Sequence, residues 1–303
     1  MAITQRQYTG EPGFTEDFHR VRAFLVDLGE RNPAALGFHW GRWEWGFSLP
    51  YLDTTNLHRI GVWEDDGRIV ALAAYEQSPG WAWLPVAPGY ERLKPEMLDY
   101  VREHLTDNEG RVRALLADGD LPAEQAARAR GWHATGHKEQ LARIDITPEA
   151  TSYTLPVGFS VVSLQERVDA AALHRVLWRG FNHPGEPPEG EEHLAERRVS
   201  FAGPHKNHSL DIAVVAPNGD FVSLCGMWYE PGTAAALVEP VATDPDFRKL
   251  GLGRAAVLEG VRRCGALGAQ YAVVGSSQEF YYRLGFYPVV NETFWVARLK
   301  ETP

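Results

Sequence analysis

The chain has 303 residues, of which 44% are hydrophobic and 23% charged, a globular composition long enough for one large or two ordinary domains. Its net charge of -10 argues against a nucleic-acid binder, which needs a basic surface, and mildly favours a cationic ligand, although acidity more often serves only to keep a protein in solution. The apolar runs are too short to span a membrane, and no apolar signal core stands at the N-terminus. Cys225 and Cys264 have no metal or redox spacing, so we expect a cytoplasmic protein.

An aromatic segment, residues 38–51, stands early in the first half and contains Trp40, Trp43 and Trp45. Aromatic residues at this density usually form a core or a domain interface, and we expect that here rather than a substrate-binding wall. We expect no metal site, because the histidines have no thiol or acidic partners at ligand spacing.

The two halves of the chain resemble each other at three places. The first is a predicted hairpin, made of an apolar segment, a polar turn that ends in glycine, and a second apolar segment. In each pair the landmark residues are separated by nearly the same length, roughly 150 residues, which indicates an internal repeat. The pairs are residues 63–76 and 215–230, 82–86 and 236–241, and 127–143 and 281–298.

We therefore predict two copies of one domain, residues 1–150 and residues 151–303. The junction falls in residues 145–158, which are rich in turn formers and have no clear periodicity. Only the second copy contains the segment "FRKLGLGR", with Gly251 and Gly253, so its function belongs to the second half alone.

That segment lies in a predicted strand, loop, helix and strand. Residues 235–243 and 271–275 read as buried strands, and residues 257–267 show helical spacing before a stop at Gly268. The loop therefore stands at a helix N-terminus, where the first amides lack partners and the helix dipole is positive. Glycines let an anion approach those amides closely, which indicates a phosphate or diphosphate ligand. Arg248, Lys249 and Arg254 would add positive charge.

Three kinds of phosphate loop compete for this segment. A P-loop fails, because Gly253 is followed by Arg254 rather than by Lys-Ser/Thr. A dinucleotide fingerprint is formally matched by Gly251, Gly253 and Ala256. However, the segment "TDPDFRK" separates these residues from the preceding strand, and Tyr271 stands where an acidic residue is needed.

The third pattern, R/Q-x-x-G-x-G/A, is met by Arg248, Gly251 and Gly253. With Val241 and Pro245 these residues reproduce V-x-x-x-P-x-x-R-x-x-G-x-G, so the second half resembles the acetyl-CoA motif of GCN5-related N-acetyltransferases. Farther on, "FYYRLGF" resembles the closing Y-x-x-x-G-F element of that family. The first half resembles the degenerate copy of tandem members such as the mycothiol synthase type.

The resemblance implies an α/β (α+β) fold of two tandem domains. Each would contain a mixed, mostly antiparallel sheet flanked by helices, with a splayed central strand pair that receives the pantetheine arm. It also implies acetyl-CoA (coenzyme A) as co-substrate. The residues expected at the cofactor are Val241, Arg248, Lys249, Leu250, Gly251, Leu252, Gly253, Arg254 and Ala255.

Two catalytic residues follow from the same resemblance. Tyr281 stands four residues before Gly285, the family position of the acid that protonates the departing thiolate, and a phenol is protonated at neutral pH. Glu239, on the strand that would meet the thioester, is the candidate base for the amine, and the alternatives are a solvent-facing Glu239, a water chain or an amine already neutral in bulk solvent. We expect Tyr281 to lie on a short helix, with Ser276 and Glu279 as its capping box.

The acceptor is expected beside residues 178–198, a loop rich in proline and glycine. Phe181 and His183 could line its channel. Acidic residues there would suit an amine, although Glu191 and Glu192 are better explained as a solvated helix start. The acidic residues are Glu186, Glu189, Glu191 and Glu192.

The sequence thus predicts an acetyl-CoA-dependent N-acetyltransferase that acts on a small primary amine by direct transfer in a ternary complex. The alternatives are a non-catalytic acetyl-CoA sensor and, less favoured, a dinucleotide-dependent oxidoreductase. We expect a small-molecule partner, no nucleic acid, no membrane and no metal, and a homodimer is left open.

Overall fold

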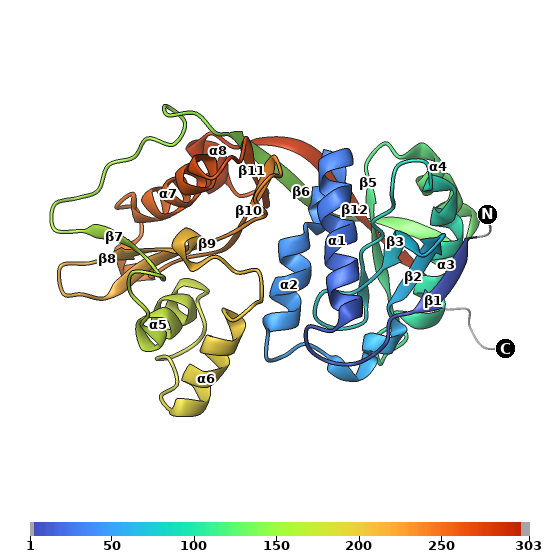
Figure 1. Cartoon of the computed structure of the whole chain (residues 1–303), viewed down its shortest axis with the longest axis horizontal. Coiled ribbons are helices and arrows are strands. Elements are labelled where there is room, and N and C mark those ends of the chain that lie inside the picture. The colour runs from blue at the N-terminus through green and yellow to red at the C-terminus, as the bar shows by residue number, and fades with distance from the viewer. Residues whose placement is uncertain (1–2, 298–303) are drawn as a thin grey trace. The chain divides into compact units, whose positions relative to one another are not determined.

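The computed structural model describes residues 3–297, and these residues form two compact units. The first unit consists of residues 3–141, 275–277 and 288–297, and the second of residues 142–274 and 278–287. Along the chain the same order of ten elements occurs twice: strand, two helices, three strands, helix, strand, helix and strand (Figure 1). The repeat that the sequence indicates is therefore present in the element order.

The first unit contains a three-stranded antiparallel sheet in the order β1-β2-β3. Its predicted hairpin turns at Asp66 and Gly67, which both have positive φ, as a two-residue hairpin turn requires. In a second group of strands, β5 pairs in parallel with β4 and antiparallel with β12. The elements are β1 (Thr4–Gln7), α1 (Glu16–Arg31), α2 (Trp40–Ser48), β2 (Gly61–Asp65), β3 (Arg68–Ala73), β4 (Trp81–Ala82), α3 (Lys94–His104), β5 (Arg113–Ala117), α4 (Leu121–Ala129), β6 (Trp132–Asp145) and β12 (Tyr287–Ala297).

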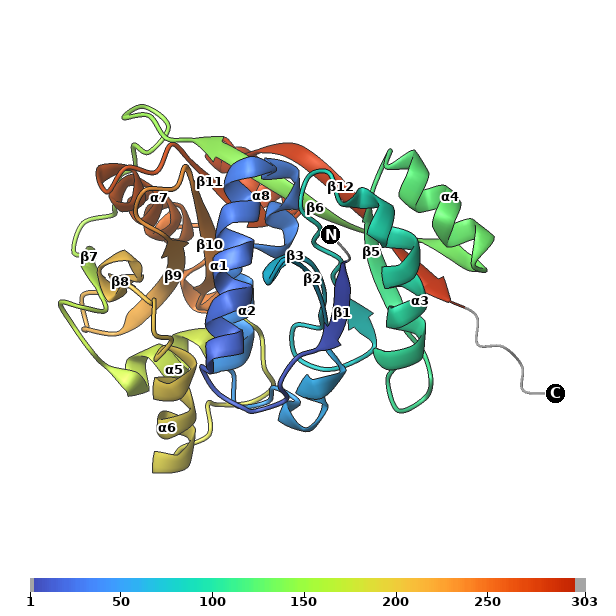
Figure 2. The same cartoon turned by 45° about the vertical axis from the view of Figure 1, so that its right-hand side comes forward.

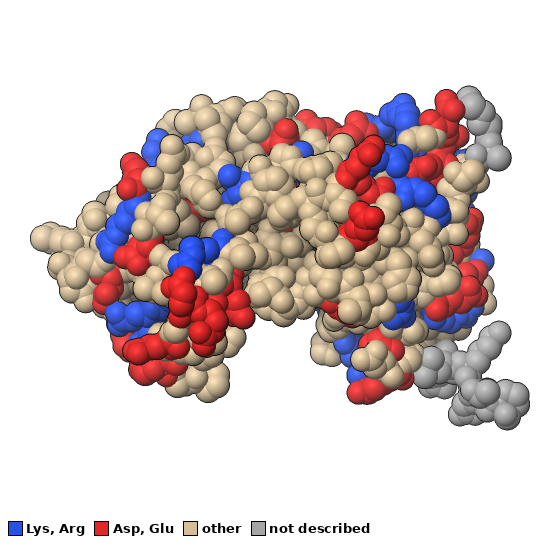
Figure 3. Space-filling view, turned by 60° about the horizontal axis from the view of Figure 1, so that its bottom comes forward, with Lys and Arg blue, Asp and Glu red and all other residues tan. Residues whose placement is uncertain are grey.

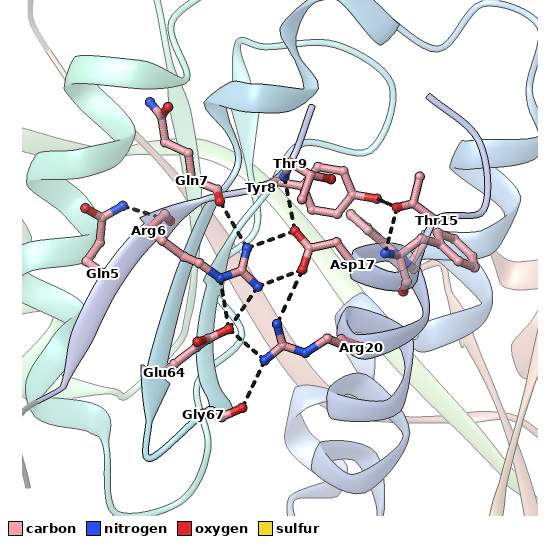
Figure 4. A network of polar contacts seen from close by, with 12 residues as sticks. Gln5, Arg6, Gln7, Tyr8, Thr9, Thr15, Asp17, Arg20, Glu64 and Gly67 are labelled. Atoms are coloured by element: carbon pink, nitrogen blue, oxygen red, sulfur yellow. Dashed lines mark hydrogen bonds and ion pairs between the residues drawn. The ribbon is translucent and has the colours of Figure 1, made fainter. Parts of the chain in front are cut away.

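A polar network ties the first strand of this unit to its first helix and second strand (Figure 4). The Arg6 guanidinium donates two hydrogen bonds to the Asp17 carboxylate, at 2.7 and 2.8 Å, and one to Glu64 at 2.9 Å. Arg20 donates to the same Glu64 oxygen at 2.8 Å. Burial acts to raise the pKa of Asp17, but the Arg6 hydrogen bonds and the Thr9 amide outweigh it and lower that pKa.

The aromatic segment of the first half contributes to the core of this unit. Trp40 and Trp43 are each 2% exposed, and Trp45 is buried as well. Phe18 stacks on Trp43 with 5.9 Å between ring centroids. The expectation that these tryptophans form a core is confirmed.

The second unit has a mixed sheet with helices on both faces. The strand order is β11-β10-β9-β8-β7, and only the pair of β10 and β11 is parallel. In Figure 1, α7 lies on one side of β8, β9 and β10, and α5 lies on the other, as the contacts also show. The elements are β7 (Ser160–Ser163), α5 (Ala170–Gly180), α6 (Glu191–Ser200), β8 (Ile212–Val215), β9 (Phe221–Tyr229), β10 (Ala235–Thr243), α7 (Leu252–Ala266), β11 (Tyr271–Gly275) and α8 (Glu279–Leu284).

Covering both faces explains why every residue of β9 is buried. Alternate β9 residues, Cys225, Met227 and Tyr229, join the apolar side of α7 in one core cluster. Both cysteines are buried and unpaired, so no disulfide links them.

The last strand of each repeat passes from one unit to the other. Most of β12, the last strand of the second repeat, lies in the first unit, where Glu292 is paired with Ala117 of β5. Conversely, residues 142–145 at the end of β6 belong to the second unit.

Within the described part of the chain, no helix is both long and apolar enough to cross a membrane. Over the same residues, no group of three or more potential metal ligands is found.

Candidate functional site

Strands β10 and β11 separate in the middle of the second unit. Their parallel pairing runs from Ala235 opposite Tyr271 to Leu237 opposite Val273, and no further pair follows among the described residues. On its other edge β10 stays paired with β9 as far as Thr243 opposite Ser223. One edge of β10 beyond Leu237 therefore carries peptide groups that the sheet does not use.

A bulge in β10 lies where this separation begins. The register with β9 shifts between Val238 and Val241, and the bond between Glu239 and Pro240 is cis. The indole Nε1 of Trp228 donates a hydrogen bond to the Glu239 carbonyl at 2.9 Å. Gly226 lies so close that an added Cβ would be 2.7 Å from the same oxygen, so this position needs glycine.

After β10 the chain turns through a short 3-10 helix, Pro245–Phe247, which Asp244 caps. Asp244 is buried, and its carboxylate accepts hydrogen bonds from Arg179 of α5 at 2.7 and 3.2 Å and from the Asp246 amide at 3.0 Å. Burial acts to raise the pKa of Asp244, but these bonds lower it, so the carboxylate is charged at neutral pH. Arg179 thereby fixes the start of the glycine loop.

The Arg248 side chain is also used to hold the loop. It donates to the Thr243 carbonyl at 3.1 Å, to the Gly180 carbonyl at 2.9 Å and to Asn182 Oδ1 at 2.9 Å. Lys249 has a positive φ of 65°, and its exposed ammonium group forms no hydrogen bond or ion pair with the described residues. Of these two cations, Lys249 is the one available to a ligand.

Helix α7 begins directly after the loop. Gly251 is its N-cap in the left-handed region, with φ of 80°, and no side chain caps the helix. The first amides of a helix have no partner in it, so those of Leu252, Gly253 and Arg254 are candidates for binding an anion. The next amide, that of Ala255, donates to the Gly251 carbonyl at 3.0 Å.

A cleft of about 950 Å³ lies between these elements, within the range of small-molecule sites. Of the residues expected at the cofactor, seven line it, whereas Leu250 and Ala255 do not. The sequence analysis missed Asn182, Phe247 and Phe280, which also line it. Its place just after the end of α5 is the sequence feature that could have identified Asn182. The seven expected residues are Val241, Arg248, Lys249, Gly251, Leu252, Gly253 and Arg254.

Tyr281 lines the same cleft from α8 and is 7% exposed. Burial raises its pKa above the usual value for a phenol, and the nearby Cys225 and Glu239 raise it further. The hydroxyl is therefore protonated at neutral pH. The capping-box prediction is wrong: α8 begins at Glu279 after Gln278, and no side chain caps it. The turn at residues 275–278 is thus not shaped by a serine cap.

Glu239 lies on the bulge and is half-buried. Its negative charge is the smallest of the three causes that raise the pKa of Tyr281. Glu239 does not line the cleft, so of the two residues that the sequence analysis selected for acid–base chemistry only Tyr281 lies along it.

The expected acceptor segment forms the end of α5, a loop and the start of α6. Phe181 lines the cleft, whereas His183 stacks on Trp178 with 4.5 Å between ring centroids. The side chains of Glu191 and Glu192 are 76% and 75% exposed in the first turn of α6, as expected for a solvated helix start. Figure 3 shows acidic side chains gathered at the lower left, on the part of the surface that belongs to the second unit.

Comparison with known proteins agrees with this geometry. The model of the acetyltransferase (GNAT) family matches residues 170–286. A mycothiol acetyltransferase of Cellulomonas flavigena is 25% identical over 225 residues, which are 68% of this chain and 63% of that protein. The match thus spans less than two thirds of the length of this relative.

Two solved structures show the fold over nearly the whole chain. A tandem GNAT protein from the clavulanic acid biosynthesis pathway has a TM-score of 0.64 and 16% identity, and the match covers 100% of both chains. A GCN5-related N-acetyltransferase from Sphaerobacter thermophilus has a TM-score of 0.59 and 15% identity, with 97% of this chain and 95% of that chain covered. Residues 170–286 therefore match the acetyltransferase (GNAT) family model, and the chain as a whole has the fold seen in a tandem GNAT protein.

Proposed function

We propose that this protein is an acetyl-CoA-dependent N-acetyltransferase that acts on a small primary amine by direct transfer in a ternary complex. The observation that carries the proposal is the cleft of the second unit. There an uncapped helix N-terminus with a double-glycine loop, the open edge of a bulged strand and a protonated tyrosine line one space.

The diphosphate of the nucleotide would lie on the amides of Leu252, Gly253 and Arg254 at the positive end of α7. Gly251 and Gly253 support this role, because neither places a side chain over those amides. Lys249 would add a point charge, and the Arg248 side chain would act by holding the loop. The pantetheine arm would lie along the open edge of β10 near Val241, where peptide groups lack sheet partners.

The transfer forms a bond between the amine nitrogen and the acetyl carbon and breaks the bond between that carbon and sulfur. The amine must lose a proton to expose its lone pair, and we assign this proton to Glu239, directly or through water. The departing thiolate must gain a proton, and we assign its source to the Tyr281 hydroxyl, which burial keeps protonated at neutral pH.

A small amine is the acceptor that the charges favour. The net charge of -10 raises the local concentration of cations, and the loop after α5 and the first turn of α6 expose the carboxylates of Glu186 and Glu191. The similarity to a mycothiol acetyltransferase also favours a small-molecule acceptor. It does not identify the amine, because the match spans 63% of that protein.

The direct test measures release of free CoA from acetyl-CoA with a panel of amines, including amino sugars, amino acids, polyamines and aminoglycosides. The proposal expects turnover with at least one small primary amine, with formation of the matching acetamide. If acetyl-CoA protects the protein against heat but no amine in the panel is acetylated, the sensor function is favoured instead. If NAD(P)H protects the protein against heat and acetyl-CoA does not, the proposal is wrong and the oxidoreductase hypothesis is favoured.

A further inference from the structure

The first unit contains a second, smaller cavity of about 250 Å³, at the place that corresponds to the cleft of the second unit. It lies between residues 32–38, which follow α1, residues 83–86, β5 and the start of α3. In the repeated element order, β4, which residues 83–86 directly follow, corresponds to β10, β5 to β11, and α3 to α7. Figure 2 shows α3 and α4 beside β5.

This cavity is not built for a diphosphate. Helix α3 begins without a glycine loop, at Lys94 and Pro95. The Lys94 ammonium is paired with the Asp120 carboxylate, which also caps α4. The start of the helix is thereby closed by an internal ion pair, and the acidic residues around it oppose an anion.

The cavity instead contains the carboxyl group of Glu292, which forms no direct ion pair with the described residues. Glu292 extends from β12 into the lining, and the absence of a side chain at Gly37 leaves room for its carboxyl group. Among residues 3–297, no hydrogen bond or ion pair to this carboxyl group is found. A carboxylate in such a place favours a cation that brings its own hydrogen-bond donors.

Charged groups on four neighbouring elements face Glu292. Burial raises its pKa to about 7, and the Glu139 charge on β6 adds to this, whereas Arg42 of α2 and Lys94 of α3 lower it. Asp118, just after β5, raises it slightly. The group therefore gains or loses its proton near neutral pH.

The remaining lining selects the kind of cation. Besides Glu292, the lining contains the carboxylates of Glu91 and Asp120 and the single ammonium group of Lys94, so negative groups are in excess even without Glu292. Phe38, Leu84 and Leu116 supply an apolar wall. At about 30 Å³ per small group, the volume suits a ligand of about five to eight heavy atoms.

We propose that this cavity of the first unit is a binding site for a small alkylammonium ion, with the Glu292 carboxylate as its counter-ion. The alkyl chain packs against Phe38, Leu84 and Leu116, and the ammonium group donates hydrogen bonds to Glu292. When Glu292 is protonated, binding releases that proton to solvent, and the ammonium charge takes its place.

Three probes of similar length distinguish the charge that the site prefers: n-butylammonium is positive, 1-butanol is neutral and butyrate is negative. Each is titrated calorimetrically into the full chain without acetyl-CoA, so the result does not depend on the proposed function. The site predicts binding of butylammonium, with affinity about tenfold higher at pH 8 than at pH 6 because Glu292 ionises in this interval. Equal binding of 1-butanol, stronger binding of butyrate, or no pH dependence overturns the proposal.

Two further measurements test whether Glu292 is the counter-ion. In wild-type protein at pH 7, titration in two buffers of different ionisation enthalpy should show release of about half a proton per bound butylammonium ion. Glu292→Gln should weaken butylammonium binding at least tenfold at pH 8, whereas Asp27→Asn, an exposed carboxylate of the same unit, should not. No proton release in the wild-type protein contradicts the proposal even if the Glu292→Gln variant fails to fold.

Discussion

The Oγ1 atom of Thr243 lies 3.0 Å from the position that a Cβ atom would take on Gly253, and the Phe280 ring lies 3.3 Å from it. This approach brings the end of β10, the start of α7 and α8 together at the floor of the cleft. It explains the second glycine of the loop by packing, whereas the first, Gly251, is explained by its φ of 80°.

Gly253→Ala should therefore weaken acetyl-CoA binding at least tenfold, or about 1.4 kcal/mol, because the methyl group displaces Thr243 or Phe280 at the cleft. Isothermal titration measures the effect. Gly136→Ala is the matched control, since nothing lies within 4 Å of its added Cβ, and it should bind like the wild-type protein. Equal affinity of both variants would show that the close approach does not shape the nucleotide site.

Substitutions of Arg248 and Lys249 should weaken acetyl-CoA binding with different dependence on salt concentration. Lys249→Ala removes an exposed charge, so its loss of acetyl-CoA affinity should shrink as ionic strength rises from 0.05 to 0.5 M, roughly from weak to strong screening. Arg248→Ala removes hydrogen bonds to Thr243, Gly180 and Asn182, so its loss should persist at high salt. The same salt response in both variants would contradict the assigned roles.

Tyr281→Phe should lower kcat by about 10²-fold and change KM for acetyl-CoA little, because the hydroxyl acts on the departing sulfur rather than on binding. Its pKa is raised, so the acid form persists as pH rises, and activity should not fall on the alkaline side below the ordinary phenol pKa. Tyr282→Phe, on the neighbouring side of α8, should retain full activity. Unchanged kcat in Tyr281→Phe would remove this residue from the mechanism.

Glu259 should make the second unit sensitive to acid. Burial acts to raise its pKa, but hydrogen bonds from Arg262, Arg263 and Tyr153 lower it to about 2. A lowered pKa stabilises the fold above the unfolded value near 4.5, and this stability is lost as pH falls from there toward 2.

Glu259→Gln should lower the free energy of unfolding by about 2 kcal/mol at pH 7, an effect that disappears near pH 2. Denaturant unfolding at several pH values measures it. Asp27→Asn removes an exposed carboxylate and should cost less than about 0.5 kcal/mol. A constant difference between wild type and Glu259→Gln across the pH range would refute the electrostatic explanation.

The local sequence was sufficient to predict the main elements of the site. Strands Ala235–Thr243 and Tyr271–Gly275 have the predicted bounds, because apolar runs between turn residues define both. The stop of α7 also follows the prediction, since Gly268 adopts a φ of 114° after the helix. Local chemistry decides each of these features.

Long-range packing decides what the sequence analysis missed. The loop cations were treated alike, but the Arg248 side chain is held by the end of α5 and Lys249 is exposed, a difference set by residues about 70 positions away in sequence. The capping box failed because α8 starts beyond Ser276. The exchange of β6 and β12 between the units leaves no local signal, since strand pairing partners are chosen by the whole fold.

The most direct test of the account is a crystal structure of the full chain with acetyl-CoA. We predict that the diphosphate lies within hydrogen-bond distance of the Leu252, Gly253 and Arg254 amides, with the thioester sulfur beside the Tyr281 hydroxyl. A nucleotide bound away from the start of α7, or a thioester outside the reach of Tyr281, would contradict the account.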